Sequence, residues 1–532
     1  MFKGLLKSRV LWYLGRYRYF RGDIHGAREC FERMITIRPS ALGGYVLLAS
    51  CNIELQRYNE AVPPLQEALQ AEPDLAVAHG YLGIAFYQLG RQQEALEEFT
   101  RALRINPRLR PIDYWKDWRG QASYAVGRWQ EAIECFEEAI QVQPSAYCYS
   151  HLAAAHKALG HYTEALEASQ KAVRVKAHDA DFEFELGSSY CDLERYEEAL
   201  QHFQESARLN PVSSEAKLWR GIALGQLGRC QESIAALQEA IRLDPQNAIA
   251  FCSLGLSHAQ LRRFPEALEA YKQAVALDVE CFDAYGNLGI TYMEMGRHAE
   301  AVDSFRAACC LKPQELAPHY GLIWACAHMN RFADSIEECM KVLQIDPQNV
   351  AAYEGLGFVW AKQGQYEEAL MALQQSLSLE PDSPDAHWNV GSVLWQAGRY
   401  EEAIEEAQRA LAIQPNCAEA HCVMGLALGG LGKTDEAIQE YIIALGIDTN
   451  NFEARVHLAD AYFDTGRYPE ALQEIEKASE LQPDQADVRF LLGAVHAKLG
   501  HLSIAREQLA ALKTLDPEYG EELENLLDGK PS

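Results

Sequence analysis

A unit of 34 residues recurs along almost the whole of this 532-residue chain. The segments GRWQEAIECFEEAIQVQP (127–144) and GRYEEAIEEAQRALAIQP (398–415) show the self-similarity directly. With the recurring proline counted as position 32, fifteen repeats begin at Ser8, Leu42, Ala76, Asp113, Ala146, Ala180, Ser214, Ala248, Phe282, Leu316, Val350, Pro384, Ala418, Phe452 and Ala486. The step is 34 residues, except for 37 into the fourth repeat and 33 into the fifth. Such a period predicts an array in which each repeat buries its apolar face against its neighbours.

Each repeat carries the signals of two helices joined by a tight turn. Apolar residues recur at positions 4, 7 and 11 and again at 24, 27 and 28, which is helical spacing. Small residues at position 8 (Gly in 11 repeats) and position 20 (Ala in 13) let the two helices approach closely. Position 15, which is Gly in 11 repeats, suits the left-handed conformation after a helix, and Pro at position 32 in 12 repeats ends the second helix.

One repeat shows what the array resembles. Its pattern residues are Tyr285, Leu288, Gly289, Tyr292, Ala301, Phe305, Ala308 and Pro313. This pattern resembles the tetratricopeptide repeat, and the resemblance covers 8–519. It implies an all-α fold, a right-handed superhelical solenoid of antiparallel helix pairs. It also implies a scaffold or adaptor without enzymatic activity, which holds partner polypeptides in a concave groove.

Three segments fall outside the regular array. Residues 1–7 are predicted to form a short basic leader, three extra residues lie near 110–112, and 520–532 follow the last repeat. In this last segment Leu523, Leu526 and Leu527 lie on one side of a helical pattern and glutamates lie elsewhere. The pattern predicts a C-terminal capping helix with a polar outer face, followed by a tail.

By the resemblance, positions 2, 5, 9, 12 and 13 of the first helices line the groove. Position 2 is acidic in seven repeats, including Asp283 and Asp385, and position 5 is never Lys. Aromatic side chains stand at several of these positions: Phe184, Tyr320, Trp324, Phe358, Trp388 and Trp395. We therefore predict a groove that binds apolar and basic segments of other proteins or peptides, with aromatic anchors. Packing of these aromatic residues against neighbouring helices is the alternative.

The first 22 residues carry six basic and no acidic side chains, interleaved with aromatic residues. In one interpretation this segment is simply the first helix of the first repeat. In a second, it contacts an anionic membrane or a partner, and the protein is then a membrane-peripheral assembly factor docked through this helix. A cleaved signal is a third interpretation, although cleavage would remove part of a repeat.

Two local motifs carry further hypotheses. The stretch NPRLRPIDYWKDWRG indicates a partner-binding loop with Arg110, Trp115 and Trp118, or only a tolerated irregularity. The stretch ALGGLGKT at 427–434 is close to a phosphate-binding loop, which raises the remote alternative of a nucleotide-binding regulator acting through Lys433. That loop needs a strand before it, whereas the repeat predicts a helix there.

The sequence indicates no further chemistry. Four histidines, His79, His319, His387 and His421, share position 4, an aromatic position of the pattern, and are predicted to pack. The chain has no zinc-protease, nucleophile-elbow or dinucleotide-binding motif and no CxxC pair. We therefore predict no catalytic residues, no cofactor and no metal site.

Charge and cysteine content narrow the partners and the compartment. A net charge of −28 opposes nonspecific binding to nucleic acid and to an anionic membrane, both of which need a basic surface, so membrane contact is expected only through the basic N-terminal helix. No apolar run reaches the length of a membrane-spanning helix, and 14 scattered cysteines suit the reducing cytoplasm. The expected partners are other proteins, and self-association through the ends or the groove stays open.

Overall fold

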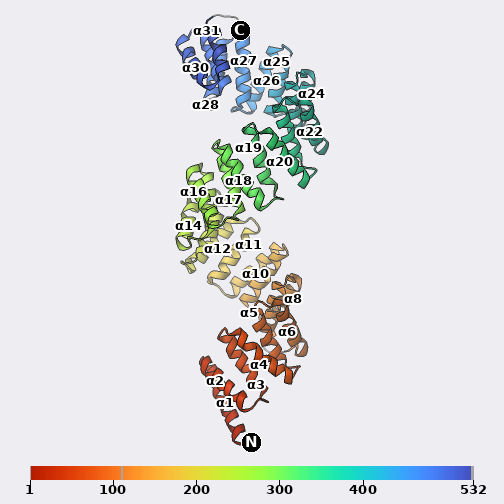
Figure 1. Cartoon of the computed structure of the whole chain (residues 1–532), viewed down its shortest axis with the longest axis vertical. Helices are drawn as coiled ribbons and strands as arrows, with labels where there is room; N and C mark the ends of the chain where they lie inside the picture. The colour runs from red at the N-terminus through yellow and green to blue at the C-terminus, as the bar shows by residue number, and fades with distance from the viewer. Residues whose placement is uncertain (1, 109–111, 484, 529–532) are drawn as a thin grey trace. The chain divides into compact units, whose positions relative to one another are not determined.

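The computed structural model describes residues 2–108, 112–483 and 485–528, and over these residues it contains 31 helices and no strand. The chain divides into two compact units, Met1–Leu277 and Asp278–Ser532, in each of which the helices follow one another in chain order (Figure 1). The predicted all-α solenoid of antiparallel helix pairs is confirmed.

The N-terminal unit contains the first eight helix pairs. They are α1 (Phe2–Phe20), α2 (Ile24–Ile37), α3 (Leu42–Glu54), α4 (Tyr58–Ala71), α5 (Ala76–Gln88), α6 (Gln92–Ile105), α7 (Ile112–Ala125), α8 (Trp129–Val142), α9 (Ala146–Ala158), α10 (Tyr162–Val175), α11 (Ala180–Cys191), α12 (Tyr196–Leu209), α13 (Ser214–Gln226), α14 (Cys230–Leu243), α15 (Ala248–Gln260) and α16 (Phe264–Leu277).

The C-terminal unit contains seven further pairs and a final single helix. They are α17 (Phe282–Glu294), α18 (His298–Leu311), α19 (Leu316–His328), α20 (Phe332–Ile345), α21 (Val350–Lys362), α22 (Tyr366–Leu379), α23 (Pro384–Gln396), α24 (Tyr400–Ile413), α25 (Ala418–Gly430), α26 (Thr434–Ile447), α27 (Phe452–Asp464), α28 (Tyr468–Leu481), α29 (Ala486–Lys498), α30 (Leu502–Leu515) and α31 (Pro517–Leu527).

The turn inside each repeat always places position 15 in the left-handed region. Eleven glycines there have φ between +69° and +80°. The other four repeats have Gln56, Glu194, Arg262 and Asn330 at this position, with φ between 55° and 58°. The surrounding helix pair therefore imposes the left-handed turn even where the residue is not the one that adopts it most readily.

The two helices of a pair are in close contact at position 8. A Cβ atom added to Gly289 would lie 2.5 Å from the ring of Phe305, and one added to Gly83 would lie 2.8 Å from the ring of Phe99. Both phenylalanines are almost completely buried. An aromatic ring of the second helix thus occupies the space that a side chain on the first helix would need.

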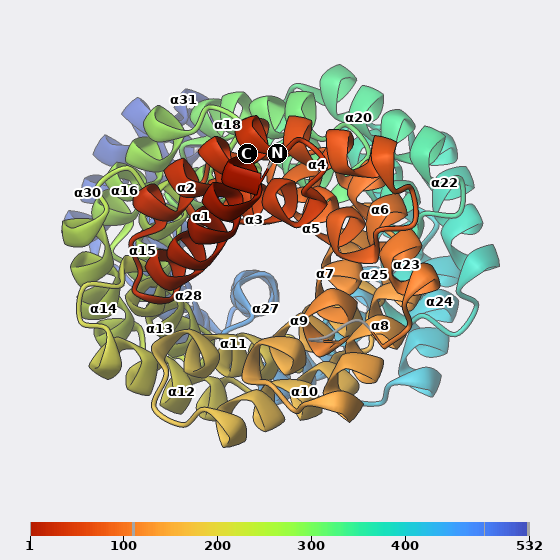
Figure 2. The ribbon, with the colours of Figure 1, turned by 90° about the horizontal axis from the view of Figure 1, so that it is seen from below.

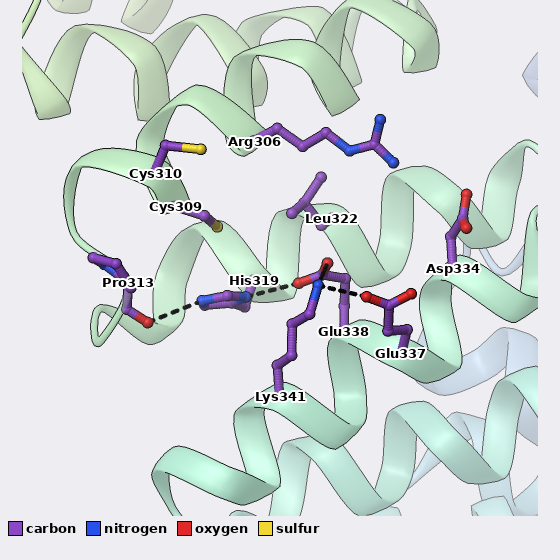
Figure 3. A pocket seen from close by; sticks show the side chains of 10 residues that line it. All are labelled: Arg306, Cys309, Cys310, Pro313, His319, Leu322, Asp334, Glu337, Glu338 and Lys341. Atoms are coloured by element: carbon purple, nitrogen blue, oxygen red, sulfur yellow. Dashed lines mark hydrogen bonds and ion pairs between the residues drawn. The ribbon is translucent and has the colours of Figure 1, made fainter.

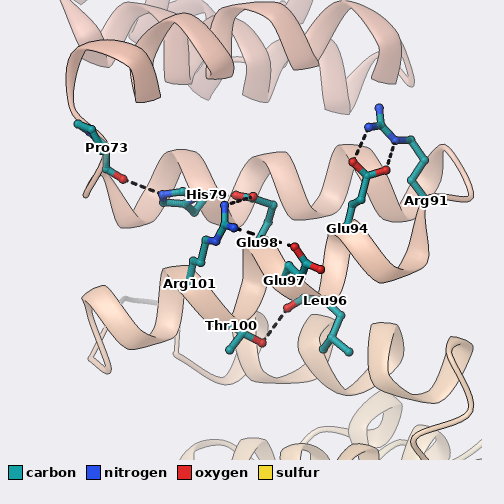
Figure 4. A network of polar contacts seen from close by, with 9 residues as sticks. All are labelled: Pro73, His79, Arg91, Glu94, Leu96, Glu97, Glu98, Thr100 and Arg101. Atoms are coloured by element: carbon teal, nitrogen blue, oxygen red, sulfur yellow. Dashed lines mark hydrogen bonds and ion pairs between the residues drawn. The ribbon is translucent and has the colours of Figure 1, made fainter.

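A polar bridge between position 4 and position 23 also joins the two helices of several pairs. His79 Nδ1 lies 2.5 Å from Glu98 Oε2, and His79 Nε2 lies 2.8 Å from the carbonyl oxygen of Pro73 in the preceding repeat (Figure 4). Equivalent pairs are His319–Glu338, His387–Glu406, His421–Glu440 and Arg455–Glu474. In α11 and α12 the order is reversed, with Glu183 and His202 2.8 Å apart. The position-4 histidines are therefore bridging groups, and the prediction that they only pack was incomplete.

The first helices lie on the inner side of each array. Contacts between first helices of successive repeats join α3 with α5, α13 with α15, α21 with α23 and α25 with α27. Within each unit, a second helix lies against its own first helix and against the first helix that follows it. Figure 2 shows the result in the N-terminal unit, where α5, α7, α9 and α11 are on the inside and α6, α8, α10 and α12 on the outside.

The two ends of the array differ. Helix α1 starts at Phe2, so residues 2–7 lie in the same helix as the start of the first repeat. Helix α31 starts at Pro517, earlier than expected, and buries Leu523 completely against Leu512 and Ala494. Among the described residues, none of the helices combines the length and the apolar character that crossing a bilayer requires.

Candidate protein-binding groove

Two aromatic side chains are exposed next to each other on the inner helices α19 and α21. Trp324 is 45% exposed and Phe358 is 37% exposed, although both are large apolar groups. Their ring centroids are 5.2 Å apart, with an angle of 53° between the planes. Both occupy position 9, so that successive repeats place them side by side. The pair forms an apolar platform that is partly in contact with water.

The platform is held by its neighbours. Tyr320 lies one helical turn before Trp324, and its hydroxyl accepts a hydrogen bond of 2.8 Å from the side-chain amide of Asn349. Lys362 lies one turn after Phe358, with its ammonium 5.5 Å from the ring centroid. The hydrogen bond orients the Tyr320 ring, and the cation–π contact favours the observed orientation of the Phe358 ring, before any partner is present.

Two carboxylates, Glu354 on α21 and Asp385 on α23, lie close enough to influence each other, and Glu354 accepts a hydrogen bond of 3.4 Å from Ser376. Glu354 lies one turn before Phe358, and burial raises the pKa of this carboxyl, with a further contribution from the nearby Asp385 carboxylate. Asp385 accepts a hydrogen bond of 3.0 Å from the indole of Trp388. We call the surface formed by Tyr320, Trp324, Glu354, Phe358, Asp385 and Trp388 the aromatic–acidic face.

The three other predicted aromatic groove residues are packed against neighbours, and two of them lie outside this face. Trp388 is half-buried against Ala410, Cys417 and Ala420 and belongs to the face through its bond to Asp385. Trp395 contacts a different neighbour, His457, at 6.4 Å between ring centroids. Phe184 packs in the N-terminal unit with its ring centroid 5.5 Å from that of Phe203.

Two more acidic groove positions lie near the C-terminal end. Burial raises the pKa of Asp460 to about 6, and the charge of Asp464 adds to this rise, although part of the Asp460 side chain is in contact with solvent. Asp283 and Asp385 at position 2 are both exposed. At the first of these two sites, a positively charged ligand would offset the mutual repulsion of the Asp460 and Asp464 carboxylates and lower the pKa of Asp460.

The two tryptophans near the insertion pack in the core and do not lie in a loop. Trp115 and Trp118 lie in α7, Trp115 is only 3% exposed, and its indole fills the space beside Gly80. Trp118 stacks with Phe99 at 6.3 Å between centroids. The predicted partner loop is therefore wrong for Trp115 and Trp118, because the insertion precedes α7 and leaves their packing intact. Arg110 lies outside the described residues.

Hollows occur on the outer side, between successive second helices. One of about 430 Å³ lies among α18, α19 and α20, and its lining includes Cys309, His319, Glu338 and Lys341 (Figure 3). Glu338 accepts from both His319 and Lys341, at 2.8 Å each. These groups satisfy one another as part of the recurring polar bridge, so the hollow presents no free acid–base pair.

The segment that resembles a phosphate-binding loop has another architecture. Helix α25 precedes it where the phosphate site requires a strand, Gly432 is the left-handed turn residue, and Lys433 precedes α26 as its N-cap. The remote nucleotide-binding interpretation therefore loses its structural basis. Over the part of the chain that the structure describes, no three His, Cys, Asp or Glu side chains are grouped as metal ligands.

Sequence reasoning missed Glu354 as a member of the face and missed the bridges. Glu354 occupies groove position 5, so its position alone could have marked it. The bridges show a pairing signal within single repeats, since every Glu at position 23 coincides with His or Arg at position 4. That spacing of 19 residues recurs at His319–Glu338, His387–Glu406 and His421–Glu440.

Family models match most of the chain. One described as tetratricopeptide repeat matches residues 13–76, 150–211, 184–248, 252–318 and 361–417. Two more of the same description match 76–109 with 115–146, and 418–451. A model described as TPR repeat matches 459–500. Among curated proteins, none matches the chain in sequence.

Solved structures of other helical arrays are similar to the chain at low identity. The Cut9–Hcn1 hetero-tetramer of the APC/C is 17% identical over 92% of this chain and 96% of that chain, with a TM-score of 0.39. Yeast Tom70 is 14% identical over 84% of this chain and 99% of that chain, with a TM-score of 0.42. Naa15/Naa10 bound to HypK-THB is 14% identical over 98% and 96%, with a TM-score of 0.36. These likenesses carry no information about partners.

Proposed function

The chain belongs to the tetratricopeptide repeat family, and we propose that it is a non-enzymatic scaffold that binds a polypeptide segment on the aromatic–acidic face. The protein–protein interaction role follows from the repeat family. The place and the chemistry of binding are the proposal. The preferred segment carries an apolar side chain flanked by Lys or Arg.

The observation that carries the proposal is the exposed pair Trp324 and Phe358. Two adjacent aromatic rings in contact with water are costly unless something covers them, and such rings are typical binding hot spots. Neither ring is needed to fill the core of its repeat, since both stand 37% or more exposed. An apolar side chain of a partner would remove this surface from water.

The charges next to the platform favour a cationic partner. Burial raises the pKa of Glu354, and Asp385 raises it further, so the ionised form of this carboxyl is disfavoured in the free protein. A Lys or Arg from a bound segment would reverse that effect by pairing with Glu354 or Asp385. The same face disfavours acidic peptides because they would add like charge.

A selection from a displayed random-peptide library, followed by fluorescence anisotropy with the enriched peptides, tests the proposal. We expect enrichment of peptides that combine apolar and basic residues. Trp324→Ala should weaken their binding at least tenfold, and Glu354→Gln with Asp385→Asn should weaken basic peptides but not charge-neutral variants of them.

Trp129→Ala is the matched control, because Trp129 is 38% exposed on α8 and lies outside the face. It should leave binding unchanged, and circular dichroism should show the same helicity for all variants. Enrichment of acidic peptides, or binding that is insensitive to Trp324→Ala, would contradict the assignment of this face.

We further propose that the protein works without cofactor in a reducing compartment such as the cytoplasm. All 14 cysteines are present as thiols. Burial raises the pKa of several of them, for example Cys51 and Cys339, each to about 12, which keeps them protonated and unreactive. Measurement of the free thiol content of purified protein under air would test whether any pair oxidises.

A further inference from the structure

Helix α1 exposes a face that is buried in every later repeat. Positions 3 and 10 of the first helix are buried in all fourteen repeats that follow, and within each unit the second helix of the preceding repeat lies against this first helix. In α1 these positions are Val10 and Tyr17, which are 59% and 57% exposed. The outer surface of the first helix is therefore an uncovered packing face.

This face is a continuous apolar and aromatic stripe. Its members are Leu6, Val10, Tyr13, Tyr17 and Phe20, with exposed fractions from 57% to 87%. At about 100° per residue they fall within a sector of roughly 80° on one side of the helix. The opposite side of α1 carries Ser8 and Gly15, which are buried against the rest of the array.

Basic side chains border the stripe on both sides. Arg9 and Arg16 follow it along one edge and Lys7 and Arg21 along the other, and all four are exposed. Arg18 is partly turned away, with its guanidinium 3.7 Å from the carboxylate of Asp23. The helix itself contains no acidic residue, in a chain whose net charge is −28. The positive charge is thus concentrated beside the exposed apolar surface.

The stripe continues into a hollow between α1 and α2. The hollow has a volume of about 550 Å³ and is lined by Leu6, Lys7, Val10, Leu11, Arg33, Thr36 and Ile37. Four of these seven side chains are apolar, and two, Lys7 and Arg33, are cationic. Such a mixture of apolar and cationic side chains suits the boundary between acyl chains and lipid phosphates.

Tyr17 argues against another repeat as the occupant. Position 10 is small or β-branched in every later repeat, for example Ala85, Ser189 and Val359, which lets the preceding helices approach closely. The phenol of Tyr17 stands in that space and would hold a stacked helix away, including one from the end of a second copy. A deformable surface accepts such a side chain, and tyrosine and phenylalanine suit the boundary between headgroups and acyl chains.

We propose that the outer face of α1 docks this protein on an anionic membrane surface. The stripe enters the headgroup boundary, and Lys7, Arg9, Arg16 and Arg21 lie over lipid phosphates. The rest of the acidic chain is repelled by the same surface, which leaves the first helix as the point of contact. The docking is independent of the aromatic–acidic face, which belongs to the other unit of the chain.

Flotation of the full chain with vesicles tests the proposal. The protein should float with vesicles of phosphatidylcholine and phosphatidylserine, should not float with pure phosphatidylcholine, and should be released by raised salt. Arg9→Glu with Arg16→Glu should weaken binding about tenfold or more. Tyr17→Ser with Phe20→Ser should weaken it to a similar extent without a change of charge.

Arg104→Glu with Arg174→Glu is the control, since both arginines are exposed on α6 and α10 and the change of charge is the same. This control and Trp324→Ala should float like the parent protein, and melting curves should show that all variants are folded. Equal flotation with neutral vesicles, or undiminished flotation of the Arg9/Arg16 variant, would overturn the proposal. Concentration-dependent self-association that is lost with Tyr17→Ser and Phe20→Ser would assign the stripe to a second copy and overturn it as well.

Discussion

Two glycines on helix α17, Gly286 and Gly289, should respond in opposite ways to replacement by alanine. Both are in the helix interior, where alanine is favoured over glycine by about 1 kcal/mol. A Cβ atom on Gly286 would meet no atom within 4 Å, whereas one on Gly289 would lie 2.5–2.7 Å from three atoms of the Phe305 ring. The substitutions therefore share the gain in propensity and differ in the overlap.

The overlap at Gly289 cannot be relieved by a small shift of the ring. Phe305 is 3% exposed, and the Cβ position of Gly321 in the next repeat lies 2.5 Å from the same ring, so the ring is confined between two repeats. Overpacking of a rigid core costs about 1–3 kcal/mol. We expect Gly286→Ala to stabilise the protein by about 0.5–1 kcal/mol and Gly289→Ala to destabilise it by roughly 0–2 kcal/mol.

The chain itself offers the compensating variant. Where position 8 is alanine, position 24 is never aromatic, as the pairs Ala49–Leu65, Ala153–Ser169 and Ala459–Ile475 show. Phe305→Leu in the Gly289→Ala background should therefore recover part of the lost stability. This rescue distinguishes overlap with the ring from any other effect of the new methyl group.

Hydrogen exchange of the α17 and α18 amides is the suitable assay, because an array of repeats opens locally and not in a single two-state step. The difference between the two alanine variants removes the shared propensity term and should be about 1–3 kcal/mol. A difference below about 0.5 kcal/mol, or a Gly289→Ala protein more protected than Gly286→Ala, would refute the close-contact reasoning.

Two other predictions concern polar groups. Glu440→Ala should lower the free energy of unfolding by about 1–3 kcal/mol, because the His421 imidazole loses its partner at 2.6 Å. The exchange His421→Glu with Glu440→His copies the order of Glu183 and His202, and it should recover most of this loss in a denaturant titration. Asp460 has a pKa raised to about 6, so the stability that its protonated form provides is present below about pH 4 and lost as the pH rises through 6. Asp460→Asn should accordingly raise the melting temperature at pH 7.5 and leave it unchanged at pH 4, and equal shifts at both pH values would contradict this.

The fold could be predicted because the constraints are local and repeated. Position 15, whose backbone is in the left-handed region, is an example. Glycine occupies it in most repeats, and the same turn forms at Gln56, Glu194 and Arg262, where the residue type alone would not have indicated a turn. The period alone assigned these positions. The histidines at position 4 show the limit of an argument from the repeat pattern. The pattern predicts a packed ring at this position, but it does not indicate the hydrogen bond between His79 and Glu98.

The insertion shows how an irregular sequence misleads. Trp115 and Trp118 stand next to extra residues, and loops with aromatic and basic residues are often binding sites. The register of repeat positions was the better guide, because Trp115 is at position 3, which is buried in every repeat after the first. A residue's position in the repeat predicted its burial here more reliably than the composition of its neighbourhood.

The same principle explains where function concentrates in this molecule. Positions 3, 8, 10 and 20 are set by contacts between helices, so deviation from the pattern there costs stability. Position 9 is not set in this way, and the large apolar residue Trp324 gains little from packing there, since it is 45% exposed. Tyr17 is the reverse case, a bulky residue at a packing position that stays 57% exposed, with the guanidinium of its neighbour Arg21 5.4 Å from its ring centroid. Both are departures that the array does not require, so the partner of each surface should be sought in what would cover these two side chains.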